Sequence, residues 1–221
     1  MKKSILTLAL TAGLAAVSGV AAAYDAGDLI LRAGYTNVAP NDDSGAVLVD
    51  GADSGLTVGV DDNAQLGLNI VYFYDNNWAI EVLAATPFSH DIIVHTPDGN
   101  AKLAETKHLP PTVSALYFFN DKDAAFQPYA GVGVNYTVFF DEDFTSTFKD
   151  AGFSDLDLDS SFGLAAQVGF DYKLNDNWMV NASVRYIDID TTANFSAGAA
   201  KGKVDVDINP TVVSLMVGYK F

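Results

Sequence analysis

Apolar side chains alternate with polar or very small ones along much of this chain. From residue 178 to residue 186 the even positions hold Trp, Val, Ala, Val and Tyr, whereas the odd positions hold Met, Asn, Ser and Arg. Residues 126–140 and 162–172 repeat the pattern, with mainly apolar residues at the even positions. A period of two residues is typical of β-strands with one apolar face. The pattern therefore predicts an all-β protein.

The second face of these segments lacks the charges that a water-facing sheet surface carries. It is built mostly of Gly, Ala, Ser, Asn and Gln, and aromatic residues stand at the ends of the apolar face, as at Trp178 and Tyr186. This combination fits strands whose apolar face meets lipid between two aromatic girdles. After residue 23 the longest run without a charge is residues 124–140, which is 17 residues and shorter than the ~20 that a spanning helix needs. Because lipid cannot satisfy an open sheet edge, such strands must close into a barrel.

Eight such segments can be marked, at residues 28–38, 64–74, 78–94, 103–119, 125–140, 162–173, 178–189 and 203–221. The connections between them alternate in length. Those at residues 75–77, 120–124 and 174–177 are short and polar, and those at 39–63, 95–102, 141–161 and 190–202 are longer. The sequence therefore predicts an eight-stranded antiparallel transmembrane β-barrel with short periplasmic turns and longer extracellular loops.

The first 23 residues have the features of a secretory signal peptide. A basic start at Lys2 and Lys3 precedes an apolar stretch over residues 5–20, and three alanines end the segment before Tyr24. Small residues at this position are typical of a signal-peptidase site. An uncleaved membrane anchor is the alternative, but the small residues favour cleavage near Ala23. We expect a signal peptide at residues 1–23 and a barrel at residues 24–221, located in the outer membrane of a Gram-negative cell.

The chain is strongly acidic, with 12 Lys and Arg against 28 Asp and Glu and a formal charge of −16. A nucleic-acid partner is therefore excluded, because a polyanion is bound by a basic surface. The absence of cysteine excludes disulfides and thiolate metal sites. Acidic runs at residues 155–159 and 205–207 could hold calcium, but they lack EF-hand spacing, and a solvated outer face is the preferred interpretation. We expect no metal and no cofactor.

Several unusual sequence blocks resemble the outer membrane protein W (OmpW) family. They are IEVLAATPF at residues 80–88, HLPPT at 108–112, PYAGVGVNYT at 128–137, DIDTTAN at 188–194 and a final GYKF. The blocks stand in the order of the family, and the likeness extends over the whole mature chain. The resemblance implies an eight-stranded barrel that admits small hydrophobic compounds across the outer membrane.

The inward face of the predicted barrel changes in polarity along its length. Toward the periplasmic half we expect Arg32 and Arg185 to pair with Glu81 and Asp171, since unpaired charges in a narrow lumen are costly. These four residues would form a polar floor. Nearer mid-barrel and above, apolar inward residues predict a chamber for a hydrophobic solute, lined by Leu83, Leu116, Phe139, Ile187, Val212 and Met216.

Seven glycines also fall on the inward face, namely Gly34, Gly67, Gly131, Gly133, Gly163, Gly169 and Gly218. An eight-stranded barrel has an interior just wide enough for its side chains. Glycine leaves volume unfilled, so a pocket becomes feasible, but glycines also relieve the curvature of a small barrel. At the level of the sequence both interpretations stay open.

Prolines interrupt two neighbouring strands of the predicted wall. A hairpin turn centred between Asp98 and Gly99 would pair Leu83 with Ser114, and would set Pro87 against Pro110 with Pro111 beside it. Because proline has no N–H, the two strands should lose ladder hydrogen bonds at this level. The break predicts either a local kink or a lateral opening through which a hydrophobic solute could pass into the bilayer.

An enzymatic role is poorly supported. The three histidines, His90, His95 and His108, lie near one hairpin with Ser89 beside them, but adjacent strand residues face opposite sides. A cross-strand pair of Ser89 and His108 is the one remaining Ser–His arrangement. Histidines on the surface near a loop are the preferred interpretation, and we expect that the protein is not an enzyme.

The last strand ends on alternating apolar residues that include Tyr219 and Phe221, which resembles the signal read by the outer-membrane assembly machinery. We therefore expect a monomer whose partners are that machinery, outer-membrane lipid and lipopolysaccharide, and small hydrophobic solutes. Passive transport of such solutes is the favoured function. The alternatives are a non-transporting structural or interaction protein, whose loops contact phage or host factors, and an outer-membrane enzyme.

Overall fold

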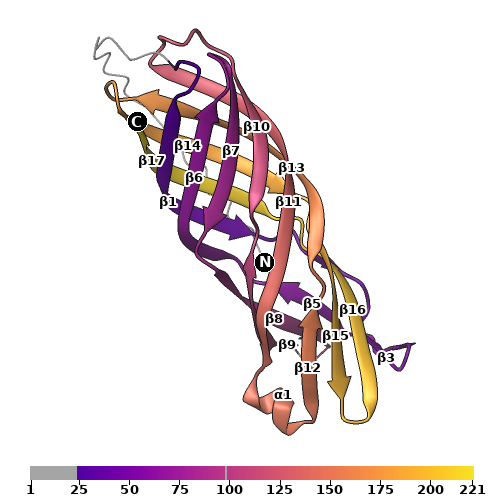
Figure 1. The fold of residues 1–221 in the computed structure, drawn as a ribbon. Helices are drawn as coiled ribbons and strands as arrows, with labels where there is room; N and C mark the ends of the chain where they lie inside the picture. The colour runs from indigo at the N-terminus through magenta and orange to yellow at the C-terminus, as the bar shows by residue number, and fades with distance from the viewer. Residues whose placement is uncertain (1–23, 98) are drawn as a thin grey trace.

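The computed structural model describes residues 24–97 and 99–221, so the predicted signal peptide lies outside the described residues. Eight antiparallel strands form a closed barrel in the order β10-β7-β6-β1-β17-β14-β13-β11, and β10 pairs with β11 to close it (Figure 1). These strands are β1 (Leu29–Ala39), β6 (Asn63–Phe73), β7 (Trp78–Ala85), β10 (Thr112–Phe118), β11 (Phe126–Phe144), β13 (Ser161–Lys173), β14 (Trp178–Ile187) and β17 (Thr211–Lys220). The predicted eight-stranded antiparallel barrel is confirmed.

The barrel has two unlike ends. At the first, called here the turn end, short connections at residues 74–77, 119–125 and 174–177 join the strands. At the second, called here the loop end, the longer connections form further elements beyond the barrel (Figure 1). These elements are β2 (Asp43–Ser44), β3 (Leu48–Val49), β4 (Ala52–Asp53), β5 (Thr57–Val60), β8 (Phe88–Thr96), β9 (Gly99–Leu109), α1 (Ser146–Asp150), β12 (Phe153–Leu158), β15 (Asp190–Ala197) and β16 (Ala200–Asp207).

The elements at the loop end make two outer sheets. One continues the barrel wall from the upper part of β11 in the order β11-β9-β8-β5, and the other has the order β12-β15-β16-β3-β4. The sequence had predicted loops at residues 39–63, 141–161 and 190–202, and this expectation was too simple. The described helix α1 has five residues, and no helix in the described part of the chain is long and apolar enough to cross a membrane.

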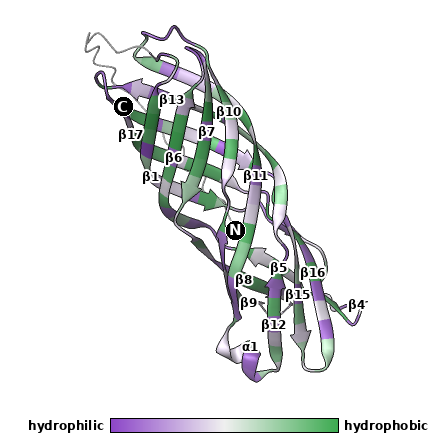
Figure 2. Cartoon of the chain, viewed as in Figure 1, coloured by the Kyte–Doolittle hydropathy of each residue, from purple (hydrophilic) through white to green (hydrophobic). Residues whose placement is uncertain are grey.

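The outward face of the barrel is an apolar band bounded by aromatic side chains. Hydrophobic residues recur along the barrel strands in Figure 2. Among the described residues, every exposed large apolar side chain lies on a barrel strand or at the turn end, and none lies on the outer sheets. The aromatic residues at the turn end include Trp78, Tyr117, Phe119, Trp178 and Phe221, and those toward the loop end include Tyr35, Tyr136, Phe162 and Tyr186. This is the surface that lipid contacts in a transmembrane barrel.

Three of the long strands that the alternation predicted are each divided in two. The breaks fall at Thr86–Pro87 between β7 and β8, at Pro110–Pro111 between β9 and β10, and at residues 208–210 between β16 and β17. All three breaks contain proline, which cannot donate to a ladder.

The predicted register across the first two breaks was wrong by two residues. Leu83 pairs with Thr112 and not with Ser114, and the neighbouring Val82 pairs with Val113. The reason is the turn, because Thr96 pairs with Gly99, where the glycine adopts a φ of +133°. An even shift leaves each side chain on its predicted face, so the division into inward and outward residues is unchanged.

The inward glycines leave no empty space. A Cβ at Gly34 or Gly163 would collide with the backbone of a neighbouring strand, and one at Gly131 would collide with the Leu116 side chain. The other four inward glycines are equally crowded, at Gly67, Gly133, Gly169 and Gly218. The glycines therefore allow neighbouring strands and side chains to approach closely, and the cavity of this barrel lies elsewhere.

Candidate functional site

A network of buried charges crosses the lumen in the half nearer the turn end. Arg32 on β1 lies at its centre, with Nη1 3.0 Å from Oε2 of Glu81 and Nη2 2.6 Å from Oδ2 of Asp171. Arg185 on β14 pairs with the other oxygen of Glu81. All four side chains are almost wholly buried. The predicted pairing of the two arginines with the two carboxylates is confirmed, and we call these four residues the polar floor.

Neutral side chains donate further hydrogen bonds to the carboxylates of the polar floor. Gln167 and Asn69 donate to Glu81 at 2.8 and 3.0 Å. Asn181 and Tyr24 donate to Asp171 at 2.8 and 2.9 Å. Two cations therefore face two anions, and each carboxylate accepts several hydrogen bonds. A buried cluster with this charge balance is rigid, and removing any one of its members destabilises the fold.

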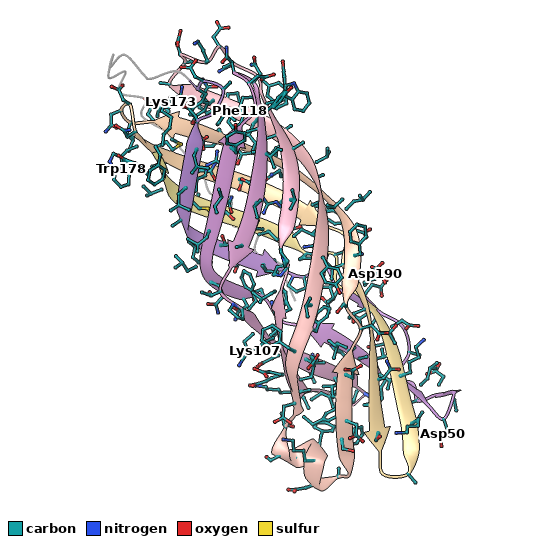
Figure 3. All side chains as sticks on the ribbon, in the orientation of Figure 1. Asp50, Lys107, Phe118, Lys173, Trp178 and Asp190 are labelled. Atoms are coloured by element: carbon teal, nitrogen blue, oxygen red, sulfur yellow. The ribbon has the colours of Figure 1, made fainter. Side chains whose placement is uncertain are left out.

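Aromatic packing closes the barrel between the polar floor and the turn end. Tyr24 packs against Phe73 with ring centroids 4.4 Å apart, and Phe118 packs against Tyr24, Phe73 and Tyr129 at centroid distances of 5.0–5.5 Å. Figure 3 labels Phe118 and Lys173 at this end, with Trp178 on the outside of the barrel. The mouth at the turn end is thus filled by side chains.

An apolar cavity of about 100 Å³ lies at the loop end, between the two outer sheets and the upper barrel. Most of its lining comes from residues that the sequence analysis had placed in loops or passed over. The lining includes Val47, Leu56, Val58, Ile92, Phe139, Phe144, Phe153, Leu158, Ile189, Ala193, Phe195, Val204, Val206 and Ile208. The cavity therefore exists only because these connections fold into sheets.

The six residues predicted to line a chamber are separated by the structure. Phe139 lines the cavity, and Ile187 and Val212 belong to the same cluster of buried apolar residues. Leu116 instead packs with Phe118 and Tyr129 beside the turn end. The remaining two, Leu83 and Met216, are buried in the lumen but belong to neither apolar cluster.

The signal for the missed residues was weak but present. Thr191, Ala193 and Phe195 alternate inward, as do Val204 and Val206, but each run covers only a few residues between acidic ones. Runs of this length do not separate a short strand from a loop.

The barrel wall loses its ladder between the polar floor and the cavity. Pairing of β7 with β10 ends at Leu83–Thr112, and pairing of β8 with β9 begins at Phe88–His108. Each intervening segment bonds to its other neighbour, since the Thr86 N–H donates to the Leu66 carbonyl and the Pro111 carbonyl accepts from the Tyr136 N–H. We call this interruption the proline break.

The residues around the proline break differ in exposure. Pro87 and Pro111 are exposed, whereas Pro110 is buried, and Thr112 donates to the Pro110 carbonyl at 3.1 Å. Pro87 and Pro110 occupy no ladder position, so the predicted opposition of these two prolines in a paired register does not occur.

Comparison with known proteins adds a family to this geometry. The sequence model of the OmpW family matches residues 25–221. The chain belongs to the OmpW family. It is 49% identical over 225 residues to outer membrane protein W of Vibrio cholerae, with both chains fully covered. The crystal structure of the outer membrane protein OprG from Pseudomonas aeruginosa has a TM-score of 0.86 and 45% identity, and covers 90% of this chain and 98% of that one.

More distant relatives retain most of the length. The dibenzothiophene metabolism operon protein PahQ of Pseudomonas aeruginosa is 27% identical over 191 residues, covering 86% of this chain and 87% of the relative. This OmpW-family protein is thus an outer-membrane barrel, and its turn end faces the periplasm.

Two of the three histidines of this OmpW-family protein are buried, so the predicted surface location was wrong for them. His90 on β8 and His108 on β9 line the cavity at 2% and 7% exposure, whereas His95 is exposed. The reason is that the parts of β8 and β9 away from the hairpin tip form one wall of the cavity. Ser89 pairs with Lys107 across the ladder and not with His108, so the remaining Ser–His arrangement is not formed.

The acidic runs at residues 155–159 and 205–207 are not gathered into a metal site. In the described part of the chain, no group of three or more His, Cys, Asp or Glu residues is placed to hold a metal ion. Asp205 accepts from Thr192 at 2.7 Å and lies 3.2 Å from the Lys203 ammonium. The hydrogen bond from Thr192, and after it the one from Lys203, lowers the pKa of Asp205 below its usual value, so the carboxylate stays ionised near neutral pH.

Proposed function

We propose that this protein passively carries small hydrophobic molecules across the outer membrane. The observation that carries the proposal is the apolar cavity at the loop end, above a polar floor that an apolar solute cannot cross cheaply. Cavities lined mainly by apolar side chains with a few polar groups are the usual binding sites for small apolar ligands. The name of the relative PahQ, which refers to the metabolism of dibenzothiophene, an apolar aromatic compound, agrees with this class of solute.

In this proposal the solute leaves the lumen sideways through the proline break. Three features support the route: the ladder is interrupted there, the break adjoins the cavity through His108, and prolines on both segments leave no N–H to rebuild the pairing. The opposite route, straight down the barrel, leads through the polar floor and the aromatic packing at the turn end. Lateral passage keeps an apolar solute in apolar surroundings throughout.

The proposal is tested by restoring the ladder. The double variant Pro87→Val with Pro110→Val is expected to close the break and to lower the flux of a hydrophobic solute into protein-containing vesicles at least about tenfold, the change that one added ladder contact can produce. Pro97→Val is the matched control, because Pro97 lies exposed at the tip of the same hairpin. Its flux should equal that of the parent protein.

Two outcomes would contradict parts of the proposal. Unchanged flux in a correctly folded double variant would refute the lateral route. Parent flux no greater than that of protein-free vesicles would refute transport itself, and would favour the non-transporting interaction role for the outer sheets.

A further inference from the structure

The cavity contains one hydrogen-bond acceptor that nothing satisfies. His90 is 2% exposed, and its Nδ1 lies 2.5 Å from the backbone carbonyl oxygen of Asp61. A carbonyl oxygen only accepts, so Nδ1 carries the proton and Nε2 of the neutral ring is left as an acceptor. Nε2 is buried and has no hydrogen-bond partner among the described residues. An unpaired buried acceptor is costly, which points to a ligand that supplies the donor.

Neighbouring side chains do not fill this role. The His108 ring stacks on His90 with centroids 4.9 Å apart and planes inclined by 21°, and it makes no hydrogen bond to Nε2. Phe88 stacks on His108 at 5.4 Å, and its ring centroid lies 6.3 Å from that of His90. Thr106, which pairs with His90 across the ladder, directs its hydroxyl to the Lys107 carbonyl at 3.4 Å. The other polar lining residues, Thr137 and Thr191, donate their hydroxyls to Asn135 and to the Asp159 carbonyl, each at 2.7 Å.

The chemistry of the two rings limits the ligand further. Burial lowers the pKa of His108 to about 3 and also lowers the pKa of His90, although Asp61, Asp62 and Asp91 act in the opposite direction on His90. Both rings are therefore neutral near pH 7 and offer no cation to a carboxylate. A carboxylate would bring two acceptor oxygens to an acceptor nitrogen and would lose its hydration as well.

We propose that the cavity selects hydrophobic molecules that carry one neutral hydroxyl group, whose O–H donates to Nε2 of His90. This inference rests on the proposed function and names its solute class: an apolar body with a single alcohol or phenol group. The His90 ring stacks on His108, and His108 is followed by Leu109 and Pro110 at the proline break. A hydroxyl bound to His90 is therefore held beside the proline break while the apolar body occupies the cavity. The solute thus reaches the break with its polar end first.

The test compares two isomers that differ in the donor alone. Binding of 1-decanol and of methyl nonyl ether to the full-length protein in lipid nanodiscs is measured by calorimetry. The parent protein should bind the alcohol about tenfold more tightly, the usual effect of one hydrogen bond to a buried acceptor. His90→Phe keeps the ring stack but removes Nε2. This variant should bind the two isomers equally, and the control His95→Phe should keep the preference.

Each outcome separates the inference from the proposed function. Equal binding of the two isomers by the parent protein would overturn the inference and leave transport standing. A preference that survives in His90→Phe would also overturn it, by placing the acceptor elsewhere. Saturable binding of neither isomer would refute the cavity as the solute site and with it the proposed function. The comparison on the parent protein decides the inference even where a variant folds poorly.

Discussion

Replacing Glu81 by Gln is expected to destabilise the barrel, because the polar floor depends on this carboxylate. Glu81 is fully buried and accepts from Arg32, Arg185, Gln167 and Asn69. Glutamine keeps the size of the side chain but removes its charge, so Arg185 loses the one ion pair that the described residues give it. Removing one partner of a buried pair costs roughly 3–5 kcal/mol, and we expect the free energy of unfolding to fall by that amount.

A second substitution identifies the cause of the loss. The double variant Glu81→Gln with Arg185→Gln leaves the polar floor with one cation and one anion. These are Arg32 and Asp171, whose Nη2 and Oδ2 atoms are 2.6 Å apart. If uncompensated charge is responsible, the double variant should be more stable than the sum of the single effects predicts, by about 2 kcal/mol. Steric disturbance alone would give additive losses.

The assay is equilibrium unfolding in phospholipid vesicles, followed by tryptophan fluorescence. Trp78 and Trp178 are suitable reporters, because they lie 48% and 47% exposed on the lipid-facing band and leave lipid when the barrel unfolds. Lys107→Gln is the control, because the Lys107–Asp141 pair is exposed and should contribute less than about 1 kcal/mol. A loss below about 1 kcal/mol for Glu81→Gln would refute the reasoning, since it would mean that water reaches the polar floor and screens its charges.

Two further predictions concern the last strand and the outer sheets. Deleting Phe221 should lower the outer-membrane yield and slow insertion, and normal insertion of the truncated chain would count against its role as an assembly signal. His108 lies on β9, outside the lipid-facing band, and burial holds its pKa at about 3 against an ordinary 6.5, so the unfolded chain binds a proton between these values that the folded protein does not. Stability should therefore fall on acidification below pH 6.5, by roughly 3 kcal/mol at pH 4 for this group. The free energy of unfolding, measured by chemical denaturation at pH 7 and at pH 4, should fall less in His108→Phe than in the parent or in His95→Phe. An equal fall in all three proteins would show that His108 is not the group responsible.

The barrel itself was predictable because the bilayer imposes the same requirement on every strand. Each outward position must be apolar, so the alternation at residues 162–172 and 178–186 continues without interruption and shows the face of every side chain. The pairing of the charged lumen residues could also be predicted, because a narrow interior leaves few ways to satisfy Arg32 and Arg185. The two-residue period together with the bilayer was sufficient to predict the strands, and the narrow lumen was sufficient to predict the ion pairs.

The outer sheets and the cavity could not be predicted in the same way. Their strands are short, and some of their pairings join distant segments, as when Gly202 pairs with Val49 and Phe153 pairs with Ala197. No local period reports such contacts. The register of the β8–β9 hairpin failed for a related reason, since the position of the turn depends on which residue adopts the positive φ, and Gly99 takes that role at the start of β9.

An apolar solute in the lumen has two routes to compare, one straight down the barrel and one sideways through the wall. The polar floor and the proline break together determine which route has the lower free-energy barrier. A solute moving straight down must separate buried ion pairs around Arg32 and Glu81 at roughly 3–5 kcal/mol for a broken pair, which slows passage by a factor of about 10² to 10⁴. It must then displace Tyr24 and Phe118 from the aromatic packing at the turn end. Between Leu83–Thr112 and Phe88–His108, by contrast, β7–β8 and β9–β10 share no ladder bonds that a solute would have to break. The lateral route that we propose therefore needs only side-chain movement, and in this proposal the stability of the polar floor directs an apolar solute toward the proline break.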